Sequence, residues 1–232
     1  MSSMRNLAII PARSGSKRIQ DKNIRDFLGK PIISYSIKAA LQSGLFEEIM
    51  ISTDDERIAD IAIKYGGKVP FFRSAETSTD FSTTIAVIKE VVSVYKNQLS
   101  KEFDLICCIY PTAPLIQVEY LRKGLSLLRK NNFDSVLPVV AYEYPIWRSF
   151  EITEGDKIKM IWPKYQNSRS QDLKKVYHDA GQWYWINMNH NKDEIFTQNT
   201  GSIVLSEHEV QDIDNLSDWT IAEMKYTLLN KN

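Results

Sequence analysis

The sequence predicts an α/β fold in which a mostly parallel sheet is covered by helices on both faces. Short unbroken apolar runs recur along the chain, such as residues 7–10 (LAII) and 105–110 (LICCIY). Between these runs lie longer stretches with apolar residues at helical spacing. Strands without alternating polar residues are typical of parallel sheets, because both of their faces are buried. The alternation of strand and helix therefore favours one α/β sheet.

The expected elements follow one another through the first 140 residues. Strands are predicted at residues 7–10, 48–52, 69–72, 105–110 and 135–140. Helices are predicted at residues 30–43, 56–65, 82–97 and 115–129. Pro31 suits the start of the first helix, and Gly44 suits its end. Asp54 is interpreted as the cap of the second helix.

The pattern changes between residues 142 and 176, which are rich in Tyr, Trp, Pro and Lys and show no helical periodicity. Three aromatic side chains of this segment would be costly to expose without a partner: Trp147, Trp162 and Tyr165. We interpret the segment as a β-rich dimerisation arm inserted into a single domain of residues 1–232. A self-contained lobe is the alternative. Strands at residues 182–187 and 202–205 and a helix at residues 217–229 are predicted to complete the domain.

The composition is that of an ordinary globular protein, with 43% hydrophobic and 25% charged residues among 232. Lys+Arg and Asp+Glu both number 29, so nucleic acid is not expected as a partner. No run approaches the roughly 20 apolar residues of a membrane span, and the N-terminus lacks a signal-peptide core. We therefore expect a cytoplasmic protein without membrane contact. Cys107 and Cys108 are strand neighbours, expected to be buried and reduced on opposite faces.

The loop after the first strand, residues 12–23, reads ARSGSKRIQDKN. Gly15 between two serines provides backbone N–H groups that can face an anion. Four cations of the loop suit phosphate oxygens: Arg13, Lys17, Arg18 and Lys22. We predict a polyphosphate site, with an exposed basic turn as the alternative that charge alone does not exclude. GxGxxG and GxxxxGK[ST] are both missing, which excludes an ordinary dinucleotide fingerprint and a P-loop.

Residues that follow the other strands are candidates for the same site, because ligands of open α/β sheets bind beyond the carboxyl ends of the strands. Arg73 follows the strand predicted at residues 69–72, with a surface ion pair as the alternative interpretation. A turn with two prolines, Pro111 and Pro114, follows the central strand. These prolines make the turn rigid and leave Tyr110 and Thr112 to frame a base or a ribose.

Asp212 and Asp214 alternate along a segment expected to be extended, so both carboxylates project to the same face. There they can share a hard divalent cation such as Mg²⁺, which normally accompanies a polyphosphate substrate. The alternative is helix capping ahead of Ser217, which the spacing alone favours. The predicted polyphosphate site in residues 12–23, called the phosphate loop below, favours the metal-binding interpretation.

Polar side chains crowd the segment from Asn167 to Gln182, just before a predicted strand. Arg169 can pair with a substrate carboxylate. The hydroxyl groups of a sugar can bond to the other polar side chains of the segment, Gln171, Asp172, His178, Asp179 and Gln182. His178 beside Asp179 also allows a catalytic interpretation, although a lone surface histidine is the more common case.

Seven stretches carry a resemblance that spans nearly the whole chain in one order. They are IPARSGSKRIQDKN, GKPIISYSI, ISTDDERIADIA, CCIYPTAP, NSRSQDL, YHDAGQWYW and DIDNLSDW. The first resembles the signature of the CMP-sialic acid synthetases, also called acylneuraminate cytidylyltransferases, and the others match the same family. Within it, the chain is most similar to members that activate pseudaminic acid, a nine-carbon acidic sugar.

The resemblance implies a Rossmann-like fold of the nucleotide-diphospho-sugar transferase type, a homodimer formed through the arm, and Mg²⁺ as cofactor. It implies that the triphosphate of CTP is held by Arg13, Ser16, Lys17, Lys22 and Asn23, with Arg73 and Ser82 near the cytidine. With the rest of the loop and rim, the expected nucleotide site comprises Ala12, Arg13, Ser14, Gly15, Ser16, Lys17, Lys22, Asn23, Arg73, Ser82, Tyr110, Pro111 and Thr112. The expected catalytic residues are Arg13, Lys22 and Asp214, the metal ligands Asp212 and Asp214, and the sugar-binding residues Arg169, Gln171, Asp172, His178 and Gln182.

The implied reaction is attack of the sugar's anomeric hydroxyl on the α-phosphorus of CTP, which gives a CMP-sugar and pyrophosphate. Tyr110 stands where sialic acid synthetases typically have Gln, and Ala180-Gly181-Gln182 where they have an Asn-Gly-Ala stretch. Both departures resemble the pseudaminate-activating members, and Lys22-Asn23 differs from the Lys-Pro of KDO enzymes. The alternatives are a synthetase for N-acetylneuraminate or another nonulosonate, and a non-catalytic nucleotide-binding module. The aspartate pair argues against that module.

Overall fold

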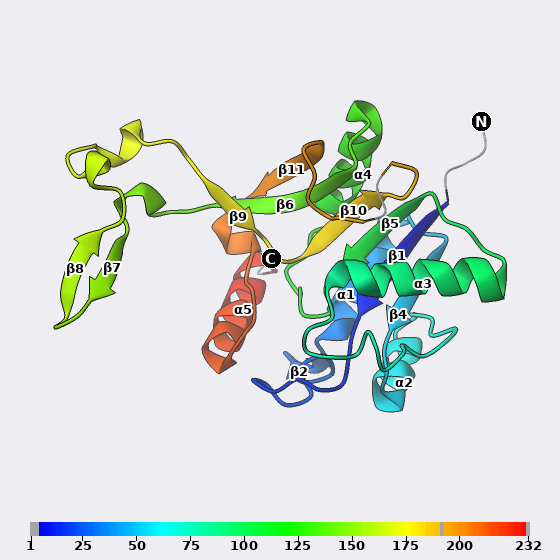
Figure 1. Cartoon of the computed structure of the whole chain (residues 1–232). Coiled ribbons are helices and arrows are strands. Elements are labelled where there is room, and N and C mark those ends of the chain that lie inside the picture. Colours follow the sequence, from blue (N-terminus) through cyan, green and yellow to red (C-terminus); the bar gives the residue numbers. More distant parts are fainter. Residues whose placement is uncertain (1–4, 191–192, 231–232) are drawn as a thin grey trace.

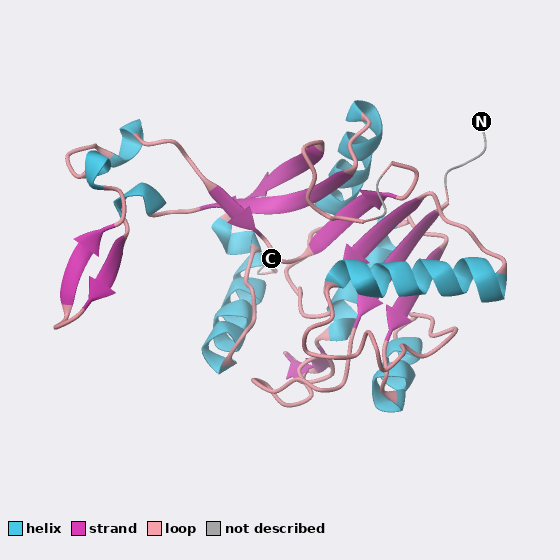
Figure 2. Ribbon diagram, viewed as in Figure 1, coloured by secondary structure: helices cyan, strands magenta, loops and turns pink. Residues whose placement is uncertain are grey.

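A seven-stranded sheet forms the centre of the molecule in the computed structural model, which describes residues 5–190 and 193–230 (Figures 1 and 2). Its strands are β1 (Asn6–Pro11), β4 (Glu48–Ser52), β5 (Leu105–Ile109), β6 (Ser135–Ala141), β9 (Tyr177–Asp179), β10 (Trp183–Asn187) and β11 (Thr200–Leu205). The order across the sheet is β11-β6-β10-β5-β1-β4, and β9 pairs with β6.

The sheet is mixed but mostly parallel. β1 lies between β4 and β5 and is parallel to both, and β11 is parallel to β6. β10 runs antiparallel to β5 and β6, and β9 runs antiparallel to β6. Five strands of this sheet therefore point their carboxyl ends to one edge, which is where the sequence places the phosphate loop.

Helices cover both faces, as predicted. α3 (Thr84–Leu99) lies on one face, and α1 (Ile33–Ser43), α2 (Glu56–Lys64) and α4 (Val118–Asn131) lie on the other. The alternation of β1 explains this, because Leu7 and Ile9 pack in the layer of α3 while Ala8 and Ile10 pack in the opposite layer. Cys107 and Cys108 divide between the same two layers, and both are buried free thiols, as expected.

One predicted strand is absent, and two helices begin three residues later than predicted. Residues 69–72 form no strand, and Lys68 alone makes an isolated bridge to Met50. Lys30 and Pro31 belong to a small hairpin, β2 (Asp26–Phe27) with β3 (Lys30–Pro31), so the first helix begins only at Ile33. α4 begins three residues later than expected, after the extended residue Gln117. In each case, residues that the apolar spacing assigns to a helix or strand form a local turn or extended segment instead.

The C-terminal helix α5 (Leu216–Leu229) packs against the hairpin β2–β3 rather than on the central sheet. Its Trp219 joins a buried cluster with Ile19, Phe27 and Ile213. The ring of Phe27 meets that of Trp219 edge-on, with centroids 5.6 Å apart. Burial of Ile213 beside Ile19 brings the segment 212–214 against the phosphate loop, although about 190 residues separate them in sequence.

The segment 142–176 stands away from the sheet (Figure 1). It holds one hairpin, β7 (Phe150–Thr153) with β8 (Lys157–Met160), and three short 3₁₀ turns at residues 146–148, 163–165 and 170–172. Trp147 packs against Trp162 and Tyr165, with ring centroids 5.5 and 5.7 Å away. These aromatic residues thus contact one another within the chain. In the described part of the chain, no helix is long and apolar enough to cross a membrane.

Candidate active site

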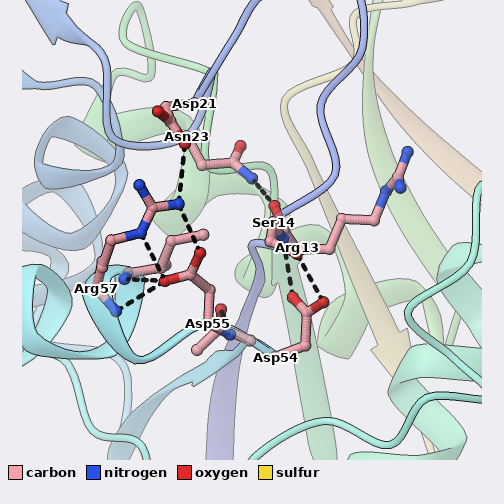
Figure 3. A network of polar contacts seen from close by, with 9 residues as sticks. Arg13, Ser14, Asp21, Asn23, Asp54, Asp55 and Arg57 are labelled. Atoms are coloured by element: carbon pink, nitrogen blue, oxygen red, sulfur yellow. Dashed lines mark hydrogen bonds and ion pairs between the residues drawn. The ribbon is translucent and has the colours of Figure 1, made fainter.

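The loop after β1 is tied to the β4–α2 connection by its backbone and by Ser14. The Ala12 N–H donates to the Ser52 carbonyl (2.8 Å), which extends the β1–β4 pairing by one residue. The N–H and the hydroxyl of Ser14 donate to the two oxygens of Asp54, at 2.8 and 2.9 Å (Figure 3). The Asn23 side-chain amide donates to the Arg13 carbonyl (2.9 Å) and closes the loop. The loop is therefore held in one shape before any ligand arrives.

Asp55, and not Asp54, caps helix α2, so the interpretation of Asp54 as a helix cap was wrong. Asp55 is extended and accepts hydrogen bonds from the N–H groups of Arg57 and Ile58. The Arg57 guanidinium bonds to Asp55 and lowers its pKa. The same guanidinium reaches Asp21 at 3.1 Å, which ties the far end of the phosphate loop to α2. Asp54 is left to hold Ser14.

In the phosphate loop, side chains are more available to an anion than backbone N–H groups are. The N–H groups of Ser14 and Ser16 donate within the protein, to Asp54 and to the Ser14 carbonyl. The expected cradle of backbone donors is therefore partly used up. A Cβ at Gly15 would lie 3.3 Å from the Arg13 guanidinium, so glycine leaves room for that cation. In Figure 3, Arg13 points away from the Asp54–Asp55–Arg57 cluster.

Cations from separate segments line one cavity of about 260 Å³ at the carboxyl edge of the sheet. It is lined by Pro11, Arg13, Ser16, Lys17, Arg18, Ile19, Lys22, Asn23, Arg73, Ser82, Thr84, Val87, Thr112 and Asp214. All three expected catalytic residues and most of the expected nucleotide-binding residues are in this set. The exceptions are Ala12, Ser14, Gly15, Tyr110 and Pro111. Of these, Ala12, Ser14 and Gly15 shape the loop.

Arg73 forms a buried part of the cavity wall, with 7% of its surface exposed. Its guanidinium donates to the Ser52 hydroxyl (2.9 Å) and carbonyl (2.6 Å). Among the described residues no carboxylate forms an ion pair with it, so the alternative of a surface ion pair was wrong. Burial lowers its pKa, although arginine stays charged at neutral pH. A buried cation held by neutral oxygens keeps its charge available to an anion.

Lys22 lies near both aspartates of the C-terminal segment. Burial lowers the pKa of Lys22, and the charges of Asp214 and Asp212 partly oppose this effect. Desolvation and the neighbouring Asp214 raise the pKa of Asp212, while Lys22 opposes the rise. The two carboxylates thus repel each other, as expected of a pair that needs a cation between them. Asp214 meets Arg18 at 2.8 Å.

The aspartate pair does not cap α5, so that alternative was wrong. The side chain of Asn215 caps the helix, and Asp218 completes the capping box by accepting from the Asn215 N–H. Ile213 is fully buried, which turns its neighbours Asp212 and Asp214 to the other side of the extended segment. No group of three or more His, Cys, Asp or Glu capable of holding a metal occurs in the described residues. Asp214 is in the lining of the phosphate cavity and Asp212 is not, and the carboxylate oxygens of the two residues are of the kind that Mg²⁺ prefers.

A second cavity of about 440 Å³ adjoins the first through Thr84, which lines both. The Tyr110 and Thr84 hydroxyls lie 3.0 Å apart, and the Tyr184 hydroxyl donates to Asp179 (2.6 Å). The rings of Tyr110 and Tyr184 meet edge-on, with centroids 5.4 Å apart. Tyr110 thus faces the second cavity and not the first. This wall presents the hydroxyl groups of Tyr110 and Tyr184 and the carboxylate of Asp179. The rest of the lining includes two further carboxylates and three apolar side chains: Asp193, Glu194, Ile85, Ile195 and Phe196.

Of the residues expected to contact the sugar, Asp179 lines the second cavity, whereas Arg169, Gln171, Asp172, His178 and Gln182 line neither cavity. Arg169 and Asp172 pair with each other (2.7 Å) on an exposed turn of the arm, and Gln171 is exposed beside them. His178 faces the ring of Tyr142, with its Nδ1 2.8 Å from the Asp179 carbonyl. Gln182 is buried and donates to the Glu209 carbonyl (2.6 Å). Within one chain, Gln182 is therefore a structural brace.

A family model described as Cytidylyltransferase matches residues 7–199, which is most of the chain and includes the phosphate loop and both tyrosines of the second cavity. The chain belongs to the cytidylyltransferase family. The match ends before Asp212 and Asp214, so the family model itself does not extend to the expected metal ligands.

Curated relatives cover nearly the full length of this cytidylyltransferase. A pseudaminic acid cytidylyltransferase from Campylobacter jejuni is 42% identical over 229 residues, with 96% of this chain and 97% of the relative covered. A CMP-N,N'-diacetyllegionaminic acid synthase from Legionella pneumophila is 34% identical, with 95% of each chain covered. Relatives named for two different acidic sugars thus align with nearly the whole of this chain.

Solved structures confirm the fold. A CMP:2-keto-3-deoxy-manno-octonic acid synthetase in complex with CTP superposes with a TM-score of 0.68, covering 97% of this chain and 98% of that one at 16% identity. A 4-diphosphocytidyl-2C-methyl-D-erythritol synthase from Anaerococcus prevotii gives a TM-score of 0.62 at 15% identity. The predicted fold of the nucleotide-diphospho-sugar transferase type is therefore confirmed.

The sequence reasoning missed several residues of the site. Thr84, which separates the two cavities, was assigned only to the start of a helix. Tyr184 lay unnoticed inside a predicted strand, although an aromatic residue two positions from the strand start lies near the sheet edge. Arg18 was seen as one cation among four, and its ion pair with Asp214 depends on a contact about 190 residues apart. No spacing rule would have found that contact.

Proposed function

We propose that this cytidylyltransferase transfers the cytidylyl group of CTP to pseudaminic acid, giving the CMP-sugar and pyrophosphate. The observation that carries the proposal is the convergence of Arg13, Lys17, Lys22 and Arg73 with Asp214 on one cavity. A cavity of this charge suits a triphosphate, and the adjoining one presents hydroxyl and carboxylate groups that suit the hydroxyl groups of a sugar. The relatives named for pseudaminic acid support the choice of sugar.

The reaction forms one bond from the anomeric oxygen of the sugar to the α-phosphorus and breaks the bond between that phosphorus and the pyrophosphate oxygen. The proton of the hydroxyl passes to the surrounding water. Arg13 and Lys22 offset charge on the leaving pyrophosphate, and the rigid loop fixes the phosphates in line with the acceptor. Asp212 and Asp214 would hold Mg²⁺, which supplies further positive charge beside the phosphates when bound. The protein contributes position and charge rather than a covalent intermediate.

The acceptor is proposed to occupy the second cavity, where Tyr110, Tyr184 and Asp179 present hydroxyl and carboxylate groups. Such a wall suits the hydroxyl and acylamino groups of the sugar. The sugar carboxylate is assigned to Arg169, which lies on the arm. This assignment requires the arm to meet the cavity of a second copy, and the exposed apolar residues Ile152 and Ile158 of the hairpin support a homodimer. CTP is a cytoplasmic substrate, so the proposal includes that location.

Pyrophosphate release tests the proposal. The purified protein is incubated with Mg²⁺, each of the four ribonucleoside triphosphates, and a panel of pseudaminic, N,N'-diacetyllegionaminic and N-acetylneuraminic acids. We expect release with CTP and the greatest kcat/KM with pseudaminic acid. A preference for another acid would overturn the choice of sugar and keep the activity. Binding of CTP without turnover on any acid would instead support the non-catalytic module.

A further inference from the structure

One carboxylate already occupies the cations that line the phosphate cavity. Asp80 meets the Arg13 guanidinium through Oδ1 at 2.8 Å and the Lys17 ammonium through Oδ2 at 2.5 Å. Each oxygen thus bonds to one cation, as two oxygens of a phosphate would. These hydrogen bonds, from Lys17 first and then Arg13, hold the pKa of Asp80 below its usual range. Asp80 is therefore an anion in the free protein at neutral pH.

Asp80 lies at the tip of a loop that joins the cavity wall to helix α3. The base of the loop is fixed, because Glu90 of α3 accepts from the Ser74 N–H at 2.8 Å and from the Thr77 hydroxyl. The tip is exposed, and the side chain of its next residue, Phe81, is 94% exposed. Hydrogen bonds between Thr79 and Ser82 close the turn around Asp80, and its side chain is attached through the two ion pairs.

Asp54 and Asp80 bind the same phosphate loop in different ways. Asp54 accepts from the backbone and hydroxyl of Ser14, so it fixes the shape of the loop. Asp80 forms ion pairs with the charged ends of Arg13 and Lys17, which both line the cavity. A polyphosphate at those cations carries several negative charges against one on Asp80, and Coulomb attraction favours it at equal distance. Asp54 is compatible with a bound phosphate, whereas Asp80 competes for the same cations.

We propose that Asp80 is a placeholder for phosphate: it pairs with Arg13 and Lys17 in the free enzyme, yields them to the triphosphate, and recovers them as pyrophosphate leaves. This inference rests on the proposed function, since it assigns Arg13 and Lys17 to the phosphates of CTP. The carboxylate keeps the loop cations oriented between turnovers and limits their affinity for the product. Asp80 acts through these cations and is a positioning residue, because it does not touch the reacting atoms.

The size of the effect follows from the exposure of the pairs. Lys17 is 79% exposed and Arg13 and Asp80 about one third exposed, so each pair is screened by water. A ligand must first displace Asp80 from the two cations. Its apparent dissociation constant is therefore the intrinsic constant divided by the fraction of the protein in which the cations are free. For two exposed pairs we expect removal of the carboxylate charge to tighten pyrophosphate binding by about threefold to tenfold.

The test is calorimetric titration of the full-length protein with pyrophosphate in Mg²⁺ buffer. Asp80→Asn keeps the shape of the side chain and removes its charge, and Asp60→Asn removes the same charge from the exposed face of α2. We expect Asp80→Asn to bind pyrophosphate about threefold to tenfold more tightly, and Asp60→Asn to match the wild type. Product inhibition by pyrophosphate in the turnover assay should strengthen in parallel.

A second variant shows whether the effect runs through the cation. We expect Lys17→Met to weaken pyrophosphate binding. In that background Asp80→Asn should gain less than it does alone, because one of the two pairs is already missing. Unchanged or weaker binding by Asp80→Asn would overturn the placeholder role while the proposed function stands. A wild-type protein that binds neither pyrophosphate nor CTP would overturn both.

Discussion

The nucleotide side and the acceptor side of the site are built in different ways. On the nucleotide side, side chains from the loop after β1, from Arg73 and from the segment ahead of α5 meet at one cavity. On the acceptor side, the expected residues are spread over an exposed turn, an edge strand and the buried core. Phosphate is recognised by charge, which a few rigid cations supply, whereas a sugar is recognised by many hydroxyl contacts over a shaped wall.

The largest effect is expected on the nucleotide side, from Asp214→Ala. The side chain lines the phosphate cavity and lies beside Lys22 and Arg18. Loss of one charge-stabilising group of an active site typically lowers turnover by about 10² to 10³-fold, and we expect this size for Mg²⁺-dependent pyrophosphate release. Asp60→Asn on the exposed face of α2 is the control, because Asp218, four residues on, accepts from the N–H of Asp214 itself (2.9 Å) and holds its backbone. Near-normal turnover of Asp214→Ala with Mg²⁺ would remove Asp214 from the metal site.

The nucleotide side was largely predictable because its signals are local. The polar loop between Ala12 and Asn23 follows an apolar strand directly, and Asp212 and Asp214 straddle one apolar residue. What the sequence did not reveal is how these parts meet. Asp54 and Asp55 are neighbours of one type, yet one holds Ser14 and the other caps α2. That division depends on the backbone direction after β4, which spacing does not specify.

The acceptor side was less predictable because some of its polar residues line the second cavity, whereas others are buried in the protein core. Gln182 was expected to face the sugar, but it lies where the chain enters β10 and its amide is drawn inward to the Glu209 carbonyl. Tyr184, two residues on, presents its hydroxyl to the second cavity through Asp179. A run of polar residues indicates a polar surface. It does not say which of them are used for folding.

The pH dependence sharpens the nucleotide side, because burial lowers the pKa of Lys22 from the ordinary value of about 10.4. The charged form is the one that binds phosphate, so kcat/KM for CTP should fall as pH rises through this lowered pKa, by about tenfold per pH unit. Lys22→Arg keeps its charge over the same range and should shift the fall to higher pH. Identical alkaline profiles for both enzymes would assign the fall to another group.

A smaller effect is expected on the acceptor side from Tyr184→Phe. The phenol hydroxyl donates to Asp179, and its loss removes a hydrogen bond at the wall of the second cavity. One such bond is worth about 0.5–1.5 kcal/mol, so KM for the sugar should rise by roughly twofold to tenfold with KM for CTP unchanged. Tyr144→Phe on the exposed arm is the matched control. An equal change in both KM values would mean that Tyr184 supports the fold of the whole site.

The smallest effect on activity is expected where sequence and structure disagree, at Gln182. The residue is 3% exposed, and its side chain braces β10 against the turn at residues 207–209. Gln182→Met should therefore lower the free energy of unfolding by about 1–2 kcal/mol through the lost bond to Glu209. Because the amide faces the core, KM for the sugar should stay within about twofold of the wild type. Denaturant unfolding and pyrophosphate release separate the two effects. A normal unfolding curve with a KM for the sugar raised tenfold or more would return Gln182 to the acceptor site. The acceptor side would then be as predictable from local sequence as the nucleotide side.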